Sequence, residues 1–291
     1  MAKKKVKVIG AKDFMRLAKD AALAWNDDGA ASMGAAIAYY TIFSIAPLLI
    51  IVMAIAGFVF GADATQGHIY AQARGFVGEE GAVALQAVIK SASHPAEGIV
   101  ATLIGFTIMA VGATGVFAEL QSAMDRIWQV PVEKKQSGFL YMIRRRLLTF
   151  GMVLGVAFLL LVSLLVNAFI SALESLWNPY LAEAELVLQG VNFAVSFCIV
   201  AALFGLMFKL LPRVHVAWHD VIIGAIVTAL LFNIGKFLIG LYIGKSGVAS
   251  GFGAAGTLVA MLLWIYYSAQ IFLLGAEFTW VYAKRHGSKS K

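Results

Sequence analysis

Six apolar stretches, each about twenty residues or more in length, dominate this sequence and limit what it can fold into. An α-helix rises about 1.5 Å per residue, so roughly 20 residues cover the ~30 Å hydrocarbon core of a bilayer. Backbone groups without partners are costly in lipid, so these stretches are expected to be helices. The predicted spans run approximately from Ala35 to Phe60, Gly98 to Ala118, Thr149 to Ser171, Leu186 to Leu211, Val221 to Ile243 and Ala254 to Ala283.

The composition supports the same class. Apolar residues make up 61% of the 291 positions, and only 13% are charged, whereas a soluble protein carries about 25% charged residues. A soluble enzyme or a disordered chain is therefore excluded. The sequence predicts an all-α membrane protein, built as a bundle of six transmembrane helices.

The distribution of basic residues predicts the orientation of this bundle. Of the 23 Lys and Arg residues, 19 lie in the two terminal segments and the two connections after the second and fourth spans, and only 3 lie in the other connections. Basic residues accumulate on the cytoplasmic side of membrane proteins. Both termini are therefore predicted to be cytoplasmic, which requires an even number of spans.

A short amphipathic segment precedes the first span. Phe14, Leu17, Ala18, Ala21 and Trp25 recur at helical spacing, with charged residues between them. This pattern beside a membrane is typical of a helix in the interface plane. The chain thus divides into a basic segment with this helix (1–30), a membrane domain (31–283) and a basic tail (284–291).

Some short motifs resemble active-site sequences, but the structure predicted around them does not fit those active sites. Residues 251–256 match GxGxxG, but they follow a membrane span and not a strand. His215 and His219 are four residues apart, yet they fall in a short predicted loop that ends with Asp220 as the expected N-cap of the fifth span. No HExxH or GxSxG motif occurs. We predict no catalytic residue, no metal site, no cofactor and no enzymatic activity.

Polar residues inside the predicted spans are the remaining candidates, because ionisable groups in a membrane are costly enough to suggest function. Asn233 and Lys236 share one face of the fifth span, Gln270 and Glu277 share one face of the sixth with Tyr266, and Glu119 ends the second. A partnership of Lys236 with Glu277 or Glu119 would offset the cost of burying each charge. Two interpretations remain open, namely polar contacts that hold helices together and a transport pathway.

The first span carries Tyr40, Ser44 and Pro47 on one face. A proline kinks a helix and leaves a carbonyl group without its usual partner, and that group must face protein or water. We therefore expect a polar crevice at Pro47.

Several of these segments together resemble the YihY/BrkB family of bacterial inner-membrane proteins. The matching stretches are residues 35–47 (AAIAYYTIFSIAP), 211–214 (LPRV), 218–221 (WHDV), 235–242 (GKFLIGLY), 253–256 (GAAG) and 263–278 (LWIYYSAQIFLLGAEF). The resemblance runs from Trp25 to Ala283, and it implies a six-span helical bundle in a bacterial cytoplasmic membrane. A ribonuclease label has been attached to this family, but the sequence carries no cluster of carboxylates or acid–base pair that would support it.

The functional hypothesis is a transporter that moves a small solute, an ion or a lipid through a cavity between helices. The alternative is a scaffold for envelope assembly that transports nothing. Membrane lipids are the expected partners and nucleic acid is not, while a homo-oligomer is left open.

Overall fold

The computed structural model describes residues 10–44, 115–131, 184–246 and 256–289, together with the single positions 74, 82, 83 and 86. All regular secondary structure in this part of the chain is α-helical. The labelled helices are α1 (Ala11–Asp27), α6 (Ala184–Leu210), α7 (Trp218–Ser246) and α9 (Gly256–Arg285). Two further helices cover residues 30–44 and 115–127.

Three of these helices, α6, α7 and α9, contain stretches long and apolar enough to cross a membrane. Their bounds agree with the last three predicted spans to within a few residues. Acidic and basic residues suit the helix dipoles, since Asp220 lies in the first turn of α7 and Lys284 and Arg285 lie in the last turn of α9. The predicted third span and Pro47 lie outside the described residues.

One predicted boundary is corrected. Helix α7 begins at Trp218, so Asp220 is its third residue and not its N-cap, and the preceding loop is shorter than expected. The helix over residues 115–127 continues well past Glu119, so the end of the second span at this residue stays a prediction.

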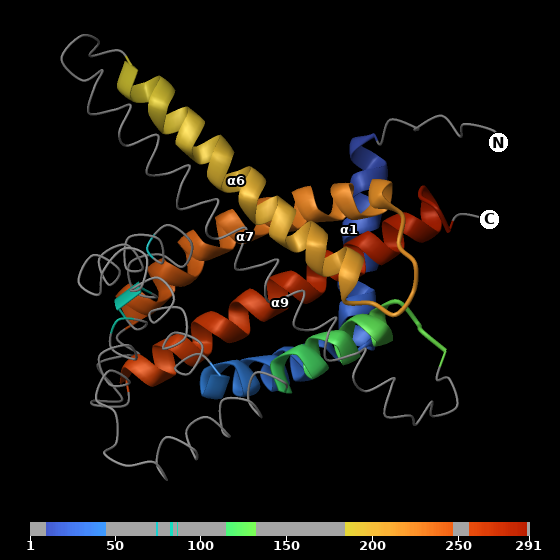
Figure 1. Cartoon of the computed structure of the whole chain (residues 1–291), viewed down its shortest axis with the longest axis horizontal. Helices are drawn as coiled ribbons and strands as arrows, with labels where there is room; N and C mark the ends of the chain where they lie inside the picture. The colour runs from blue at the N-terminus through green and yellow to red at the C-terminus, as the bar shows by residue number, and fades with distance from the viewer. Residues whose placement is uncertain are drawn as a thin grey trace, which may run out of the picture.

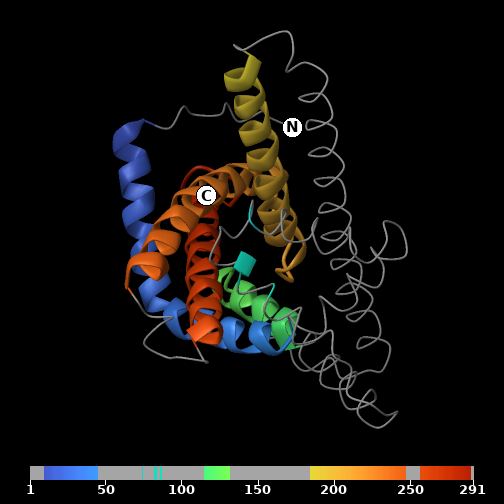
Figure 2. The same cartoon turned by 90° about the vertical axis from the view of Figure 1, so that its left-hand side faces the viewer.

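Helix α9 lies at the centre of the described bundle, with contacts to both α7 and α1. Its second half is almost completely buried, and a core cluster joins it to residues from α1, α7 and the helix over 115–127. The helices over 30–44 and 115–127 run side by side in both views (Figure 1 and Figure 2). They meet at Gly115, where an added Cβ would lie 2.6 Å from the Tyr40 ring.

Glycines set the close packing of α7 against α9. A Cβ on Gly224 would lie 1.8 Å from the Thr279 hydroxyl oxygen, and one on Gly275 would lie 2.0 Å from that of Thr228. Each threonine donates its hydroxyl proton to a carbonyl of its own helix, at 2.7 Å in both cases. Small residues of this kind let helices approach closely in membranes. These pairs also show that the two helices are antiparallel.

The outer face of α7 carries large apolar side chains at intervals of about four residues. These exposed residues are Trp218, Ile222, Ile226, Leu230, Ile234 and Phe237. A contiguous apolar surface of this kind is unusual in a water-soluble monomer and is suited to contact with lipid.

The predicted amphipathic helix is present as α1. Leu17 and Ala21 are buried, and Phe14 packs its ring 5.7 Å from that of Phe278 on α9. Arg285 and Asp20 form an ion pair beside this contact. The apolar face of α1 is therefore covered by α9, while its position in the membrane interface stays a prediction.

A tight turn joins α1 to the helix over residues 30–44. Asp28 is the C-cap of α1, and its backbone N–H donates a hydrogen bond to the carbonyl of Ala24. The next residue, Gly29, adopts φ +68°. A left-handed conformation is costly for any residue with a Cβ, so glycine suits this position. The next helix then runs antiparallel to α9, since Gly34 meets Gln270 and Ala38 clusters with Ile265 and Met261.

Candidate functional site

Glu277 lies on the face of α9 that points away from α7. Gly275 and Thr279 both face α7, and residue 277 is two positions from each, which places it about 200° around the helix from both. The Glu277 side chain is 0% exposed. Neither of its carboxylate oxygens accepts a hydrogen bond from a donor in the described part of the chain, although buried polar groups in proteins are usually paired.

The carboxylate of Asp28 faces Glu277 within hydrogen-bonding reach. Asp28 comes from the turn between α1 and the next helix, where its backbone is held by the α1 cap and by the left-handed Gly29. Ionised carboxylates are hydrogen-bond acceptors only. The contact therefore brings two acceptors together inside the protein.

Sequence reasoning missed Asp28. The Asp28-Gly29 dipeptide after an amphipathic segment is a helix-end signal, and it could have placed the turn. Nothing in the sequence, however, shows which side chain of α9 this turn approaches.

Gln270 lies two turns before Glu277 on the same face of α9. Its amide nitrogen approaches the carbonyl oxygens of Ala30 and Ala31 at 3.5 and 3.4 Å, which are long hydrogen bonds. Its amide oxygen is buried without a partner among the described residues. Gln270 and Glu277 thus lie on one face of α9, where three acceptor oxygens lack donors among the described residues.

The other predicted polar residues on α7 and the first span have local partners. Asn233 donates its side-chain N–H to the carbonyl of Ala229 at 2.8 Å, within α7. Ser44 is buried and donates to the carbonyl of Tyr40 at 2.8 Å, within its own helix. Tyr40 is partly exposed and contacts Gly115, and Glu119 is half-buried on the helix over 115–127.

The structure does not bring Lys236 and Glu277 together. Gly235 contacts Tyr267 and Ile271 of α9. Lys236 therefore lies beside the part of α9 around Tyr267, which is ten residues along that helix from Glu277. Ten residues correspond to about 15 Å along a helix. Lys236 is half-buried, and the direct pairing considered from the sequence is not formed.

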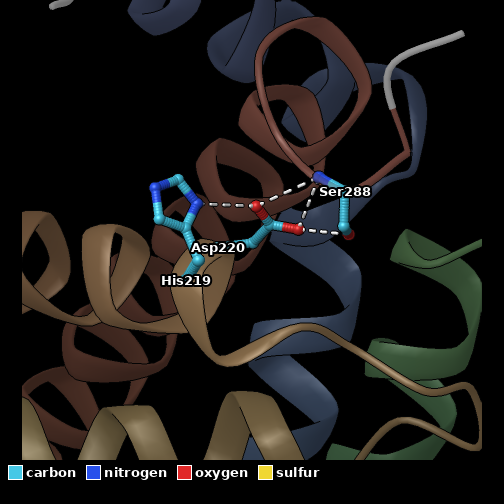
Figure 3. A network of polar contacts seen from close by, with 3 residues as sticks. All are labelled: His219, Asp220 and Ser288. Carbon is cyan, nitrogen blue, oxygen red and sulfur yellow. Dashed lines mark hydrogen bonds and ion pairs between the residues drawn. The ribbon is translucent and has the colours of Figure 1, made fainter. Parts of the chain in front are cut away.

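A second polar cluster, centred on Asp220, joins the start of α7 to the segment after α9 (Figure 3). The Asp220 carboxylate is 0% exposed. It accepts hydrogen bonds from the backbone N–H of Ser288, at 3.1 Å to Oδ2, and from the Ser288 hydroxyl at 2.5 Å. The His219 ring nitrogen Nδ1 lies 3.4 Å from its other oxygen. No sequence pattern predicted this long-range contact.

This cluster does not have the geometry of a catalytic triad. A serine nucleophile needs its hydroxyl on the histidine, which acts as the base, whereas the Ser288 hydroxyl bonds to Asp220 and not to His219. The arrangement instead fixes the chain after α9 against α7. Within the described residues, no group of three or more His, Cys, Asp or Glu side chains could hold a metal ion.

Basic residues gather at the same end of the bundle. Arg213 pairs with Asp125 at 2.8 Å, between the loop before α7 and the helix over 115–127. Lys284 lies 4.5 Å from the centre of the Trp280 ring, and Lys289 lies over the rings of both Trp280 and Trp128. Each of these basic side chains thus has a nearby partner, either an aromatic ring or a carboxylate, and the partner of Arg285 is the carboxylate of Asp20.

Comparison with known proteins places the chain in a family. The model of the family described as Virulence factor BrkB matches residues 21–291. UPF0761 membrane proteins of Pseudomonas aeruginosa and Rhodospirillum centenum are 29% and 26% identical over 91% and 88% of this chain. A UPF0761 membrane protein of Tolumonas auensis is 29% identical over 61% of it.

The chain spans 62%, 54% and 56% of the length of these three relatives. No solved structure matches the chain. The family match covers nearly the whole chain, and it agrees with the three long apolar helices. This chain is a membrane protein of the BrkB (UPF0761) family.

Proposed function

We propose that this protein is a transporter that moves a small solute, an ion or a lipid along the face of α9 that carries Gln270 and Glu277. One observation carries the proposal, namely the Glu277 carboxylate, which is fully buried and has no hydrogen-bond donor among the described residues. A buried charge held only for packing is expected to have a donor or a cation beside it. A carboxylate without one is better explained as a place where another species binds.

The chemistry of this face favours a cationic cargo or coupling ion. The polar atoms without partners on Gln270 and Glu277 are oxygens, and Asp28 adds a further carboxylate beside them. Acceptor oxygens attract protons and cations and repel anions. The segment over residues 28–44 runs along this face, so small movements of that segment relative to α9 would open or close access to it.

The proposal includes a six-span topology in the bacterial cytoplasmic membrane, with both termini on the cytoplasmic side. The charge distribution of the sequence supports this orientation. The clustering of Arg213, Lys284, Arg285 and Lys289 at one end of the bundle supports it as well. Glu277 then lies within about two turns of the cytoplasmic end of α9.

Transport is tested with purified protein in liposomes that contain a pH-sensitive dye, under an imposed potassium diffusion potential. We expect the wild type to carry protons or monovalent cations faster than protein-free vesicles. The Glu277→Gln variant should lose at least tenfold in rate. Asp27→Asn is the matched control, because Asp27 is exposed and adjacent to Asp28. Flipping of a fluorescent phosphatidylethanolamine is measured in the same vesicles.

Movement of the lipid alone would assign the pathway to lipid. Vesicles in which neither ions nor lipid move faster than in protein-free controls would contradict the transporter. That result would favour the scaffold for envelope assembly.

A further inference from the structure

We infer that Asp28 and Glu277 form a carboxyl pair that binds one exchangeable proton, which makes the proton the coupling ion of the proposed transporter. Only the role of the proton as a coupling ion rests on the proposed function. Binding of the proton is a property of the two side chains, and it can be measured without any transport assay.

The contact itself requires a proton or a cation. Glu277 is completely buried, and the Asp28 carboxylate faces it within hydrogen-bonding reach. Two ionised carboxylates cannot hydrogen-bond to each other, because neither has a donor. If one carries a proton, it becomes a donor to the other, and the pair keeps a single negative charge. Two carboxyl groups that share a site are known to share a proton in this way.

A metal ion explains the site less well. Calcium binds through about six to eight oxygen ligands, and magnesium takes about six, of which several are usually waters. Among the described residues, the nearest further oxygen without a donor on this face belongs to Gln270, which lies seven residues or about 10 Å along α9. That distance prevents Gln270 from joining Asp28 and Glu277 around one ion.

Among the described residues, no basic side chain donates to Glu277. On α1 and at the end of α9, Asp20 and Arg285 are paired with each other. The helix over 115–127 contributes Arg126, whose guanidinium lies 3.9 Å from the position of a Cβ on Gly29. Arg126 is exposed. The α7 residues level with Glu277, Ile223 and Val227, are apolar.

This arrangement gives the pair an inner and an outer member. Glu277 is buried against the bundle, whereas Asp28 is only partly buried and lies in a turn beside an exposed arginine. A proton can therefore enter through Asp28 and pass to Glu277 along their hydrogen bond. Each transfer breaks one O–H bond and forms another, so the charge of the pair does not change.

Infrared spectroscopy of the purified full chain tests this inference. A protonated carboxylic acid has a C=O stretching band that is separate from the bands of ionised carboxylates, and exposed Asp and Glu are ionised at pH 7.5. An ester-free detergent is needed, because lipid ester carbonyls absorb in the same region. We expect a band in the wild type that shifts in heavy water, as an exchangeable proton requires.

Three variants assign the band. Glu277→Gln should abolish it, because the substitution removes the buried acid of the pair. Asp28→Asn should shift it, because the hydrogen-bond partner of the Glu277 acid changes from a carboxylate to an amide. Asp27→Asn should leave it unchanged. A wild-type spectrum without the band would overturn the inference, and so would a band that persists in Glu277→Gln or stays unshifted in Asp28→Asn.

The wild-type measurement keeps the inference falsifiable even where a variant fails to fold. The result is also independent of the transport assay. A band without transport would support the proton pair and contradict the transporter. Transport without a band would support the transporter and contradict the proton pair.

Discussion

Helix α9 packs against two neighbours in different ways. On the side of α7, glycines and threonines interlock, and both threonine hydroxyls donate to carbonyl groups of their own helices. On the side of residues 28–44, the buried oxygens of Gln270 and Glu277 have no donor within the described part of the chain. Among the residues described, the same helix therefore presents one face with satisfied polar groups and one face with unsatisfied ones.

The difference separates a packing interface from a binding site. A small polar residue that satisfies itself within its helix adds close contact without a desolvation cost. A carboxylate or amide oxygen that is buried without a partner destabilises the fold, and it is expected where the protein binds something else. Substitutions on the α7 face should therefore change stability, and substitutions on the opposite face should change activity.

The largest effect is expected from Gly224→Leu. A Cβ at this position would lie 1.8 Å from the Thr279 hydroxyl oxygen, before any further atoms are added. Overpacking of this kind costs about 1–3 kcal/mol or more, so we expect a large fall in the thermal unfolding midpoint or loss of folded protein. Gly190→Leu on α6 is the control, because nothing lies within 4 Å of its Cβ position. Equal midpoints for the two variants would contradict the packing described for α7 and α9.

A charge swap between Lys236 and Glu277 should abolish transport without rescue. If the two residues formed an ion pair, the double variant Lys236→Glu with Glu277→Lys would restore what each single change removes. Lys236 packs beside a part of α9 that lies about ten residues from Glu277. We therefore expect the double variant to be at least as impaired as either single one. Recovery of the liposome flux would show that they act as a pair.

Gly29→Ala should weaken both the fold and the site. The residue has φ +68°, and a Cβ in this conformation costs about 1–2 kcal/mol. Steric crowding is not the cause, since the nearest atom of Arg126 would be 3.9 Å away. We expect a lower unfolding midpoint and a lower transport rate, because the turn positions Asp28. Gly10→Ala at the start of α1, where φ is −73°, should change neither.

Ser288→Ala should have a smaller effect on stability. The substitution removes the hydroxyl donor to Asp220 but keeps the backbone N–H that also binds this carboxylate. We expect a loss of about 1 kcal/mol, measured as a shift of the unfolding midpoint. Ser32→Ala, at an exposed position of the helix over 30–44, provides the comparison. A neutral Ser288→Ala would mean that the Asp220 cluster does not hold the chain after α9 in place.

The smallest change in stability is expected for Gln270→Leu. Leucine has a similar size, and it removes a buried amide oxygen that has no donor among the residues that the structure describes. We expect an unchanged or slightly higher unfolding midpoint, within about 0.5 kcal/mol, together with a reduced transport rate. A clear loss of stability with normal transport would place this face of α9 in the same structural role as the α7 face.

The sequence predicted the helices well and the site only in part. The length of the apolar stretches predicted α6, α7 and α9. The helical spacing of apolar residues predicted α1, with Leu17 and Ala21 on its buried side. The shared face of Gln270 and Glu277 follows from their spacing on one helix. Asp28 could not be assigned to this site, because it approaches Glu277 across about 250 residues of chain.

The sequence by itself determined that this chain forms long apolar helices and which of their residues share a face, because both properties depend on the composition and the regular geometry of a single helix. Only the tertiary structure decided which faces meet. It set Gly224 and Gly275 against threonines, turned Glu277 away from α7 toward Asp28, separated Glu277 from Lys236, and joined Asp220 to Ser288. These pairings depend on the register and orientation of packed helices, and those follow from side-chain shape across distant parts of the chain.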